Sequence, residues 1–222
     1  MLLGDFQKSA SEHARFRRDA IGTDTFDVLI LIGRPGSGKS EINDFLAHTS
    51  PEVRRRRFRI AALDILDDFP MLWAWLEEDH ILSERLGQPR LHTDADGYFK
   101  YPHLWYVLIE RLSLEYHKRL LDDSLHHDHT TTIVEFSRGS EHGGYAEAFA
   151  HLADDLLRRA AVVYVRVSYE ESLRKNRRRY NPDKPDSVLE HALEDKKIEM
   201  LYKGSDWEEF SSADPGALLV KG

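Results

Sequence analysis

A glycine-rich loop that directly follows an apolar run constrains this chain more than any other feature. Residues 26–32 form a short, β-branched and almost continuously apolar segment, which is typical of a central parallel strand buried on both faces. The next residues match the pattern G-x-x-x-x-G-K-[ST] without a mismatch, and apolar residues at helical spacing begin at Ile42. The loop consists of Gly33, Arg34, Pro35, Gly36, Ser37, Gly38, Lys39 and Ser40. This order predicts a strand, a loop and a helix in succession.

The residue types in this loop suit the binding of a polyphosphate. Glycines let backbone N–H groups converge on phosphate oxygens, Lys39 supplies a positive charge for the β and γ phosphates, and the Ser40 hydroxyl is a ligand for Mg²⁺. The helix that begins here adds the positive end of its dipole. We therefore predict that the chain binds ATP and Mg²⁺. The predicted nucleotide-binding residues of the loop are Gly33, Pro35, Gly36, Ser37, Gly38, Lys39 and Ser40.

Apolar segments and helical patterns alternate along the rest of the chain. This alternation predicts an α/β fold with one open sheet of five mainly parallel strands. The predicted strands after the first are residues 58–63, 131–136, 161–167 and 217–220. Helical patterns between them include residues 145–159 and 187–202. We expect residues 1–222 to form a single domain, with residues 1–25 as a peripheral helix outside the sheet.

Residues 65–130, between the second and third predicted strands, are expected to be a helical insertion. Two predicted helices are joined there by a polar stretch at residues 87–100. Ligands of open α/β sheets bind beyond the carboxyl ends of the strands, so we expect the insertion to shape an acceptor site, with residues 93–101 as a candidate closing loop. Its aromatic residues either stack on a ligand or belong to the core, and their helical spacing favours the core. They are Trp73, Trp75, Trp105 and Tyr106.

The glycine-rich loop resembles the P-loop of kinases that act on nucleosides, nucleotides and other small molecules, which often reads G-x-P-G-S-G-K-S as residues 33–40 do. The resemblance extends over about residues 26–202. It implies a three-layer sandwich with strand order 2-3-1-4-5, and a mobile lid rich in arginine that closes over ATP. It also implies a phosphotransferase activity that depends on ATP and Mg²⁺.

An arginine-rich segment at residues 169–186 is the predicted lid. It follows the fourth predicted strand and resembles the corresponding kinase segment. Guanidinium groups can hold the oxygens of a transferring phosphoryl group bidentately, so Arg174 and Arg178, on one helical face, are predicted catalytic residues and Arg177 a nucleotide-binding residue. The alternative is that these charges coat a solvated helix face.

Acidic residues at predicted strand ends are candidates for catalysis and metal binding. Asp64 follows the second predicted strand, where a carboxylate can accept the proton of a hydroxyl acceptor or simply cap the next helix. Glu135 lies in the third strand, where many P-loop proteins have an aspartate near Mg²⁺, so it is a candidate for metal or acceptor binding. Arg138 resembles the arginine that binds substrate phosphate in adenylate kinase-like enzymes.

The overall composition narrows the choice of partners. Acidic residues outnumber Lys and Arg 39 to 31, so the net charge of −8 argues against nucleic acid as a partner. Without cysteine, disulfides and thiolate chemistry are excluded. Neither a signal peptide nor a membrane-spanning run is apparent, and we expect a cytoplasmic protein.

Two functions are consistent with these features. The first is a kinase that moves the γ-phosphoryl group of ATP to a small-molecule acceptor, either a hydroxyl or a phosphate. The alternative is a regulatory P-loop ATPase in which nucleotide binding switches a protein partner. A GTPase is disfavoured because no Asn-Lys-x-Asp motif occurs. A particular small molecule that accelerates ADP formation would distinguish the kinase from the regulator.

Overall fold

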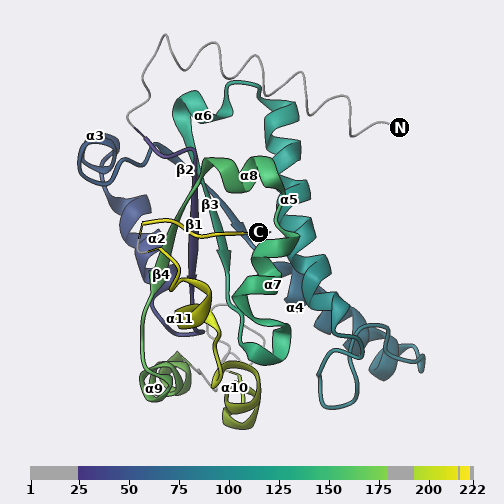
Figure 1. Cartoon of the computed structure of the whole chain (residues 1–222). Helices are drawn as coiled ribbons and strands as arrows, with labels where there is room; N and C mark the ends of the chain where they lie inside the picture. The colour runs from purple at the N-terminus through teal and green to yellow at the C-terminus, as the bar shows by residue number, and fades with distance from the viewer. Residues whose placement is uncertain (1–24, 180–192, 215, 221–222) are drawn as a thin grey trace.

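A parallel sheet of four strands forms the centre of the computed structural model, which describes residues 25–179, 193–214 and 216–220 (Figure 1). The strand order is β2-β3-β1-β4, and all three neighbouring pairs are parallel. The strands are β1 Val28–Gly33, β2 Ala62–Asp67, β3 Thr130–Phe136 and β4 Ala160–Val165. The α/β class is therefore confirmed, and the order agrees with the first four positions of the predicted 2-3-1-4-5.

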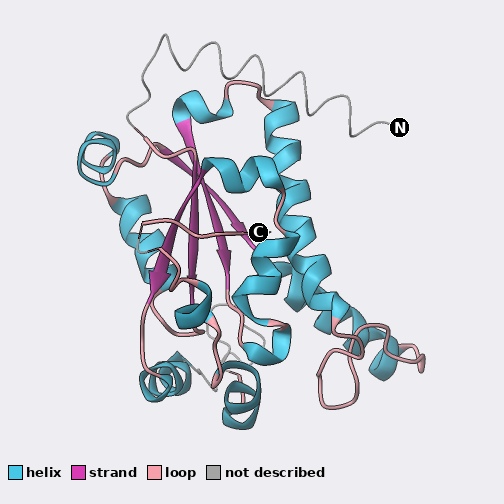
Figure 2. Cartoon of the chain, in the orientation of Figure 1, coloured by secondary structure: helices cyan, strands magenta, loops and turns pink. Residues whose placement is uncertain are grey.

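Helices connect the strands, as Figure 2 shows. Three of the helical segments are not α-helical: the π-helices η1 Arg54–Phe58 and η2 Ile81–Arg85, and the 3-10 helix η3 Ser140–His142. The α-helices are α2 Lys39–His48, α3 Pro51–Val53, α4 Phe69–His80, α5 His103–Asp122, α6 His126–His129, α7 Gly144–His151, α8 Asp154–Arg159, α9 Tyr169–Arg179, α10 Asp195–Tyr202 and α11 Trp207–Phe210. The segment expected to be one helix over residues 145–159 is thus two helices.

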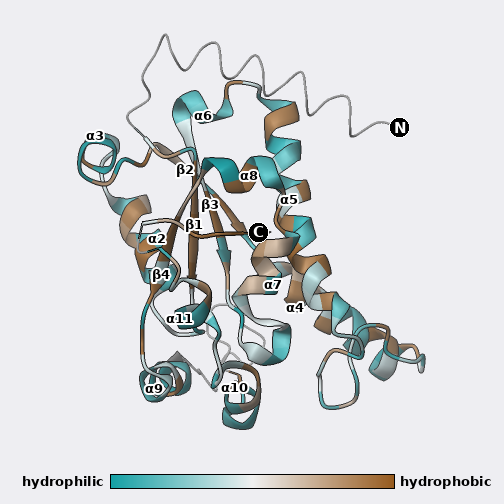
Figure 3. Cartoon of the chain, in the orientation of Figure 1, coloured by the Kyte–Doolittle hydropathy of each residue, from teal (hydrophilic) through white to brown (hydrophobic). Residues whose placement is uncertain are grey.

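The core lies on both faces of the sheet because β1 is apolar at every position. In Figure 3 most of β1 is coloured as hydrophobic, in contrast to the mixed colours of the helices. Val28, Ile30 and Ile32 pack into a cluster with residues of α5, α7 and α8. Leu29 and Leu31 face the opposite cluster, which includes residues of α2. In Figure 1, α2 lies on one side of the strands and α5, α7 and α8 lie on the other.

The second strand begins four residues later than predicted. Residues 58–61 are apolar enough to suggest a strand, but Arg59 has a left-handed backbone with φ 60°. The buried Arg54 guanidinium donates to the Ala61 carbonyl at 2.8 Å, and the Ala61 N–H donates to the Thr131 hydroxyl at 3.0 Å. Side chains therefore occupy the hydrogen-bonding groups of Ala61, and the ladder starts at Ala62 and ends at Asp67.

The predicted fifth strand is wrong for the part of the chain that the structure describes. Residues 217–220 form no strand, although Leu218 and Val220 pack against the core. The expected helix at residues 1–25 and the predicted lid beyond Arg179 lie outside the described residues. Among the described helices, none combines the length and the apolarity needed to cross a membrane.

Candidate functional site

A pocket of about 800 Å³ opens at the edge of the sheet where the carboxyl ends of the parallel strands meet. The glycine-rich loop borders one side, and α9 and α10 contribute to the same wall. The other side is formed by the start of α4, by residues 97–99 and by the start of α5. Residues after the ends of β2 and β3 form the floor between these two walls.

The backbone of the glycine-rich loop requires its glycines and is tied to neighbouring helices. Gly38 has φ 110°, which side chains disfavour, and a Cβ atom on Gly33 would lie 2.7 Å from the Val165 carbonyl oxygen. The Ser172 hydroxyl of α9 donates to the Pro35 carbonyl at 2.6 Å. The loop is therefore preformed and anchored to the helix that carries the predicted lid arginines.

Arg34 is an anchor and not a free cation in this loop. Its guanidinium donates to three backbone carbonyl oxygens, those of Val167, Tyr202 and Lys203, at 3.1–3.3 Å. These carbonyls lie after β4 and at the end of α10. The charge of Arg34 is thus used to join the loop to two distant segments, a contact that no sequence pattern predicted.

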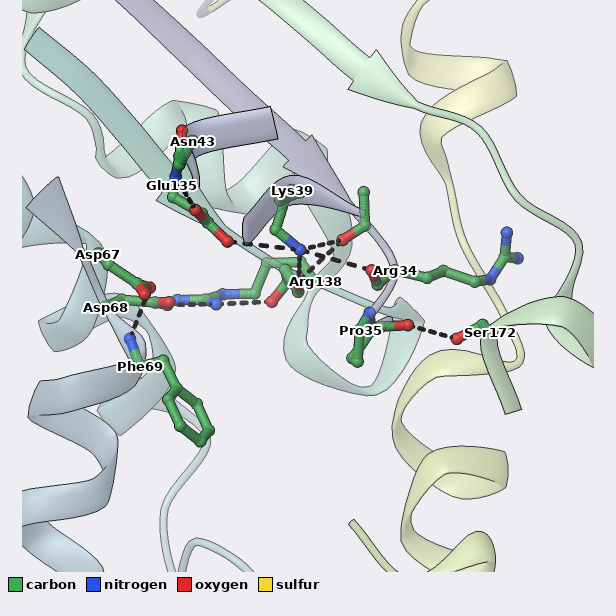
Figure 4. Close-up of polar contacts among 12 residues, drawn as sticks. Arg34, Pro35, Lys39, Asn43, Asp67, Asp68, Phe69, Glu135, Arg138 and Ser172 are labelled. Atoms are coloured by element: carbon green, nitrogen blue, oxygen red, sulfur yellow. Dashed lines mark hydrogen bonds and ion pairs between the residues drawn. The ribbon is translucent and has the colours of Figure 1, made fainter. Parts of the chain in front are cut away.

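The Lys39 ammonium lies at the centre of the loop and is buried (Figure 4). It donates to the Ser137 hydroxyl at 2.8 Å and to the carbonyl oxygens of Gly33 and Arg34 at 3.2 and 3.4 Å. It also lies 3.9 Å from a carboxylate oxygen of Glu135. Because most of these partners are neutral, the ammonium retains much of its attraction for phosphate oxygens.

Glu135 and Asp67 stand opposite each other in the register of β3 and β2. Glu135 is buried and accepts a hydrogen bond from the Asn43 amide at 2.7 Å. Burial, followed by the nearby charges of Asp68 and Glu135, raises the pKa of Asp67 to about 7, although the Phe69 N–H and Lys39 oppose the shift. Both side chains border the pocket, so the Glu135 carboxyl group lies there beside an Asp67 carboxyl group that titrates near neutral pH.

Arg138 lines the pocket, as predicted from its place after the third strand, but its charge is compensated. It is buried and lies 2.6 Å from a carboxylate oxygen of Asp68. It also donates to the carbonyl oxygens of Ser137 and Trp105 at 2.7 and 3.3 Å. Figure 4 shows this pair beside Asp67, below the Lys39 ammonium.

The expectation that Asp64 lies at the carboxyl end of its strand is wrong. Asp64 pairs with Thr132 in the middle of the ladder, three positions before Asp67. Its carboxylate lies 3.3 Å from the Arg119 guanidinium and 3.5 Å from the His126 ring. Asp64 is not among the described residues that line the pocket. The argument that selected Asp64 therefore applies to Asp67, and the error follows directly from the late start of β2.

The predicted lid arginines divide between the pocket and the solvent. Arg174 and Arg178 line the pocket together with Lys175. Arg174 also forms a two-point ion pair with Glu171 at 2.7 and 2.8 Å. Arg177 is outside the pocket lining and pairs with Asp195 of α10, with a shortest distance of 2.6 Å. A nucleotide contact by Arg177 therefore requires this ion pair to break.

Several pocket residues were missed by the sequence interpretation. Asp67 and Asp68 follow the apolar run that ends at Leu66, and a strand placed three residues later would have found them. Ser137 and Lys197 carried no recognisable motif. Trp105, assigned to the core, is largely buried but also lines the pocket.

The oxygen-rich floor of the pocket suits a divalent cation. The Ser40 hydroxyl and the carboxylates of Glu135 and Asp67 border one space, and oxygen atoms are the ligands that Mg²⁺ prefers. The crowding of Asp67, Asp68 and Glu135 that raises the pKa of Asp67 would be relieved by a bound cation. The residues therefore fit the Mg²⁺ that the loop predicts.

Comparison with known proteins yielded structural similarity but no match in sequence. No protein-family model matches the chain, and no curated protein matches it in sequence. Among solved structures, the chain is similar to a shikimate kinase from Acinetobacter baumannii in complex with shikimate, at 14% sequence identity and a TM-score of 0.39. The match covers 86% of this chain and 79% of the other. A similarity of this size assigns no activity to the chain.

Proposed function

We propose that the protein is an ATP- and Mg²⁺-dependent phosphotransferase that moves the γ-phosphoryl group to a hydroxyl of a small molecule. The observation that carries this proposal is that the Lys39 ammonium and the Asp67 carboxyl group border one pocket, which continues away from the glycine-rich loop into a second half lined by α4, residues 97–99 and the start of α5. A nucleotide on the loop and an acceptor in the second half would meet at Asp67. A regulatory ATPase does not require such a second half.

The loop side supplies the positive charge that phosphoryl transfer needs. On nucleotide binding, the Lys39 ammonium exchanges some of its contacts with Ser137, Gly33 and Arg34 for phosphate oxygens. Arg174 and Arg178 line the same space from α9 and counter the charge that spreads over the transferred group. Ser40 and Glu135 would hold Mg²⁺, which when bound neutralises part of the phosphate charge.

Asp67 is the proposed proton acceptor. As the acceptor oxygen attacks the γ-phosphorus, its proton passes to the Asp67 carboxylate while the bond to the β-γ bridging oxygen breaks and ADP leaves. In the free protein the pKa of Asp67 is about 7, and a cation bound beside it would lower this pKa, so the carboxylate would be present at neutral pH and able to take a proton. Asp67 thereby takes the role first assigned to Asp64.

The test is a screen for ADP release from ATP in the presence of Mg²⁺, with hydroxyl compounds added one at a time. The proposal predicts that a small molecule accelerates ADP formation and is itself phosphorylated, as detected by mass spectrometry. Lys39→Met should abolish the acceleration. If only a protein partner accelerates ADP formation, and no small molecule gains a phosphoryl group, the protein is a nucleotide-dependent regulator and the proposal is wrong.

A further inference from the structure

We infer that the second half of the pocket accepts a neutral alcohol with a flat ring, and that the Asp68–Arg138 pair excludes anionic acceptors. This inference rests on the proposed function and specifies the acceptor class. Arg138, considered alone, would indicate a phosphate or carboxylate on the acceptor. The side chains around it indicate the opposite.

The walls of the second half are apolar and largely aromatic. They come from three segments of the chain that are distant in sequence: α4, residues 98–99 and the start of α5. The apolar lining residues are Phe69, Leu72, Trp73, Leu76, Phe99, Pro102 and Trp105, with Tyr98 beside them. Aromatic faces of this kind bind flat, uncharged rings.

The aromatic wall is held in place from behind. The rings of Phe99 and Trp105 lie 4.5 Å apart between centroids, and Trp75, which stacks on His92 at 4.8 Å, lies 5.7 Å from Phe99. Trp75 and Trp105 are each 9% exposed. The wall is therefore part of the packed structure and presents a fixed apolar surface.

A buried carboxylate fixes the loop that carries this wall. Asp79 of α4 is fully buried and accepts hydrogen bonds from the N–H groups of Leu91, His92 and Thr93 at 2.6–3.1 Å, and from the Thr93 hydroxyl at 2.7 Å. Burial alone would raise the pKa of Asp79, but these hydrogen bonds lower it to about 2. The loop is thus anchored without a ligand.

Arg138, the buried cation in the second half of the pocket, is already paired with the Asp68 carboxylate. The Arg138 guanidinium is 2% exposed, lies 2.6 Å from Asp68, and sits over the rings of Trp105 and Phe136 at 5.3 and 5.6 Å. An anionic acceptor would meet the Asp68 carboxylate together with Arg138, and would have to break a buried ion pair to use the cation. A neutral acceptor avoids this cost and leaves the pair intact.

Among the other described cations that line the pocket, only Lys197 lies near this half. Arg174, Lys175 and Arg178 belong to α9 beside the glycine-rich loop. Lys197 of α10 lies over the Tyr98 ring at 5.3 Å. We assign this lysine to the rim, and its substitution provides a control for non-specific attraction of anions.

Binding of matched neutral and anionic probes tests the inference directly. The probes are thymidine with thymidine 5′-monophosphate, and benzyl alcohol with benzoate, each titrated without nucleotide while tryptophan fluorescence is recorded; Trp105→Phe identifies the signal from the pocket. The parent protein should bind the neutral member of each pair at least about tenfold more tightly, a difference of about 1.4 kcal/mol. Tighter binding of the anionic members, or no binding of any probe, would overturn the inference.

Two variants assign the selectivity to the ion pair. Asp68→Asn frees Arg138 and should reverse the preference for at least one pair of probes, whereas Asp68→Asn with Arg138→Gln should retain the preference for the neutral member. Lys197→Met should leave the ratio of the two affinities unchanged. If the Asp68→Asn protein does not fold, the parent and the double variant still test the inference. Equal affinities of the parent for the neutral and the anionic member of a probe pair would contradict it.

The outcomes separate this inference from the proposed function. Selective binding of neutral rings without phosphoryl transfer would contradict the proposed function alone. Phosphorylation of anionic compounds in preference to neutral ones would contradict the acceptor class alone.

Discussion

The two halves of the pocket are built in different ways. The phosphate half comes mainly from eight consecutive residues, Gly33 to Ser40, whose glycines and lysine are recognisable in the sequence. The acceptor half is assembled from the end of β2, from α4, from residues 97–105 and from the end of β3. In the first half the Lys39 ammonium contacts hydroxyl and carbonyl oxygens and lies 3.9 Å from Glu135, whereas in the second half the Arg138 guanidinium lies 2.6 Å from the Asp68 carboxylate. In the proposed function, phosphate binding is thus encoded locally, and the selection of an acceptor depends on tertiary packing.

The largest expected effect concerns the phosphate half. Lys39→Met removes the buried ammonium and should lower kcat/KM for ATP by about 10³-fold, because a preorganised positive charge is lost from the transition state. Steady-state measurement of ADP formation checks this. The nearby Arg34→Lys variant is not a matched control because Arg34 anchors the loop. Arg57→Met, in the exposed run at residues 55–57, should leave activity unchanged and serves that purpose.

The next largest loss of activity is expected for Asp67, which lies where the two halves of the pocket meet. Asp67→Asn should lower kcat by about 10²-fold while the affinity for ATP is retained, because a general base is lost and the phosphate half remains intact. Asp64→Asn, on the same strand, should have little effect on kcat because Asp64 lies outside the pocket lining. Similar losses in the two variants would show that Asp67 has no special role.

The pH dependence of the parent protein sharpens the same assignment. With a pKa of about 7 for Asp67, kcat/KM should rise with pH through about pH 7 as the carboxylate forms. Glu135 is one of the charges that raise this pKa, so Glu135→Gln should move the rise to lower pH even though its activity is reduced. A profile that is flat between pH 5 and pH 8 would contradict the assignment.

A smaller loss of activity is expected when an arginine of α9 is replaced. Arg178→Ala should lower kcat by about tenfold, because one exposed guanidinium near the transferred group is removed. Arg177→Ala, one residue away, should cost less because its side chain pairs with Asp195 outside the pocket. Equal losses would show that the pair with Asp195 breaks when nucleotide binds.

The smallest effect is on the stability of the free protein. The folded protein keeps a proton on Asp67 up to about pH 7, whereas the unfolded chain releases it near the ordinary value of 3.8. The folded state therefore binds more protons between these values, and the free energy of unfolding falls as pH rises through that window. Asp67→Asn removes this loss, so its Tm at pH 8 should exceed that of the parent by about 5 °C, with no gain at pH 4. A difference in Tm between Asp67→Asn and the parent that is the same at pH 4 and at pH 8 would contradict the raised pKa of Asp67.

The sequence was sufficient for the parts of the fold that depend on local patterns. The strands near residues 28–33, 130–136 and 160–165 were predicted because each is short and rich in apolar or β-branched residues, and their parallel arrangement followed from the alternation with helices. The glycine-rich loop was predicted in place because its residue types and spacing have one common structural use. These features need no knowledge of distant contacts.

The remaining features depend on contacts between distant residues. The start of β2 is set by the Arg54 and Thr131 side chains that hold Ala61, and a one-dimensional pattern does not contain those contacts. The error of three residues replaced Asp67 with Asp64 as the candidate base. The ion pair between Arg138 and Asp68 could not be predicted for the same reason, because α4, α5 and β3 separate the two residues in sequence.

Binding of ATP with Mg²⁺ to the purified protein, measured by isothermal titration calorimetry, tests the central claim most directly. The preformed loop around Lys39 predicts saturable binding of one nucleotide per chain, strongly weakened in Lys39→Met and retained in Asp67→Asn. Absence of binding heat in the parent at several temperatures, or an unchanged affinity in Lys39→Met, would contradict the account.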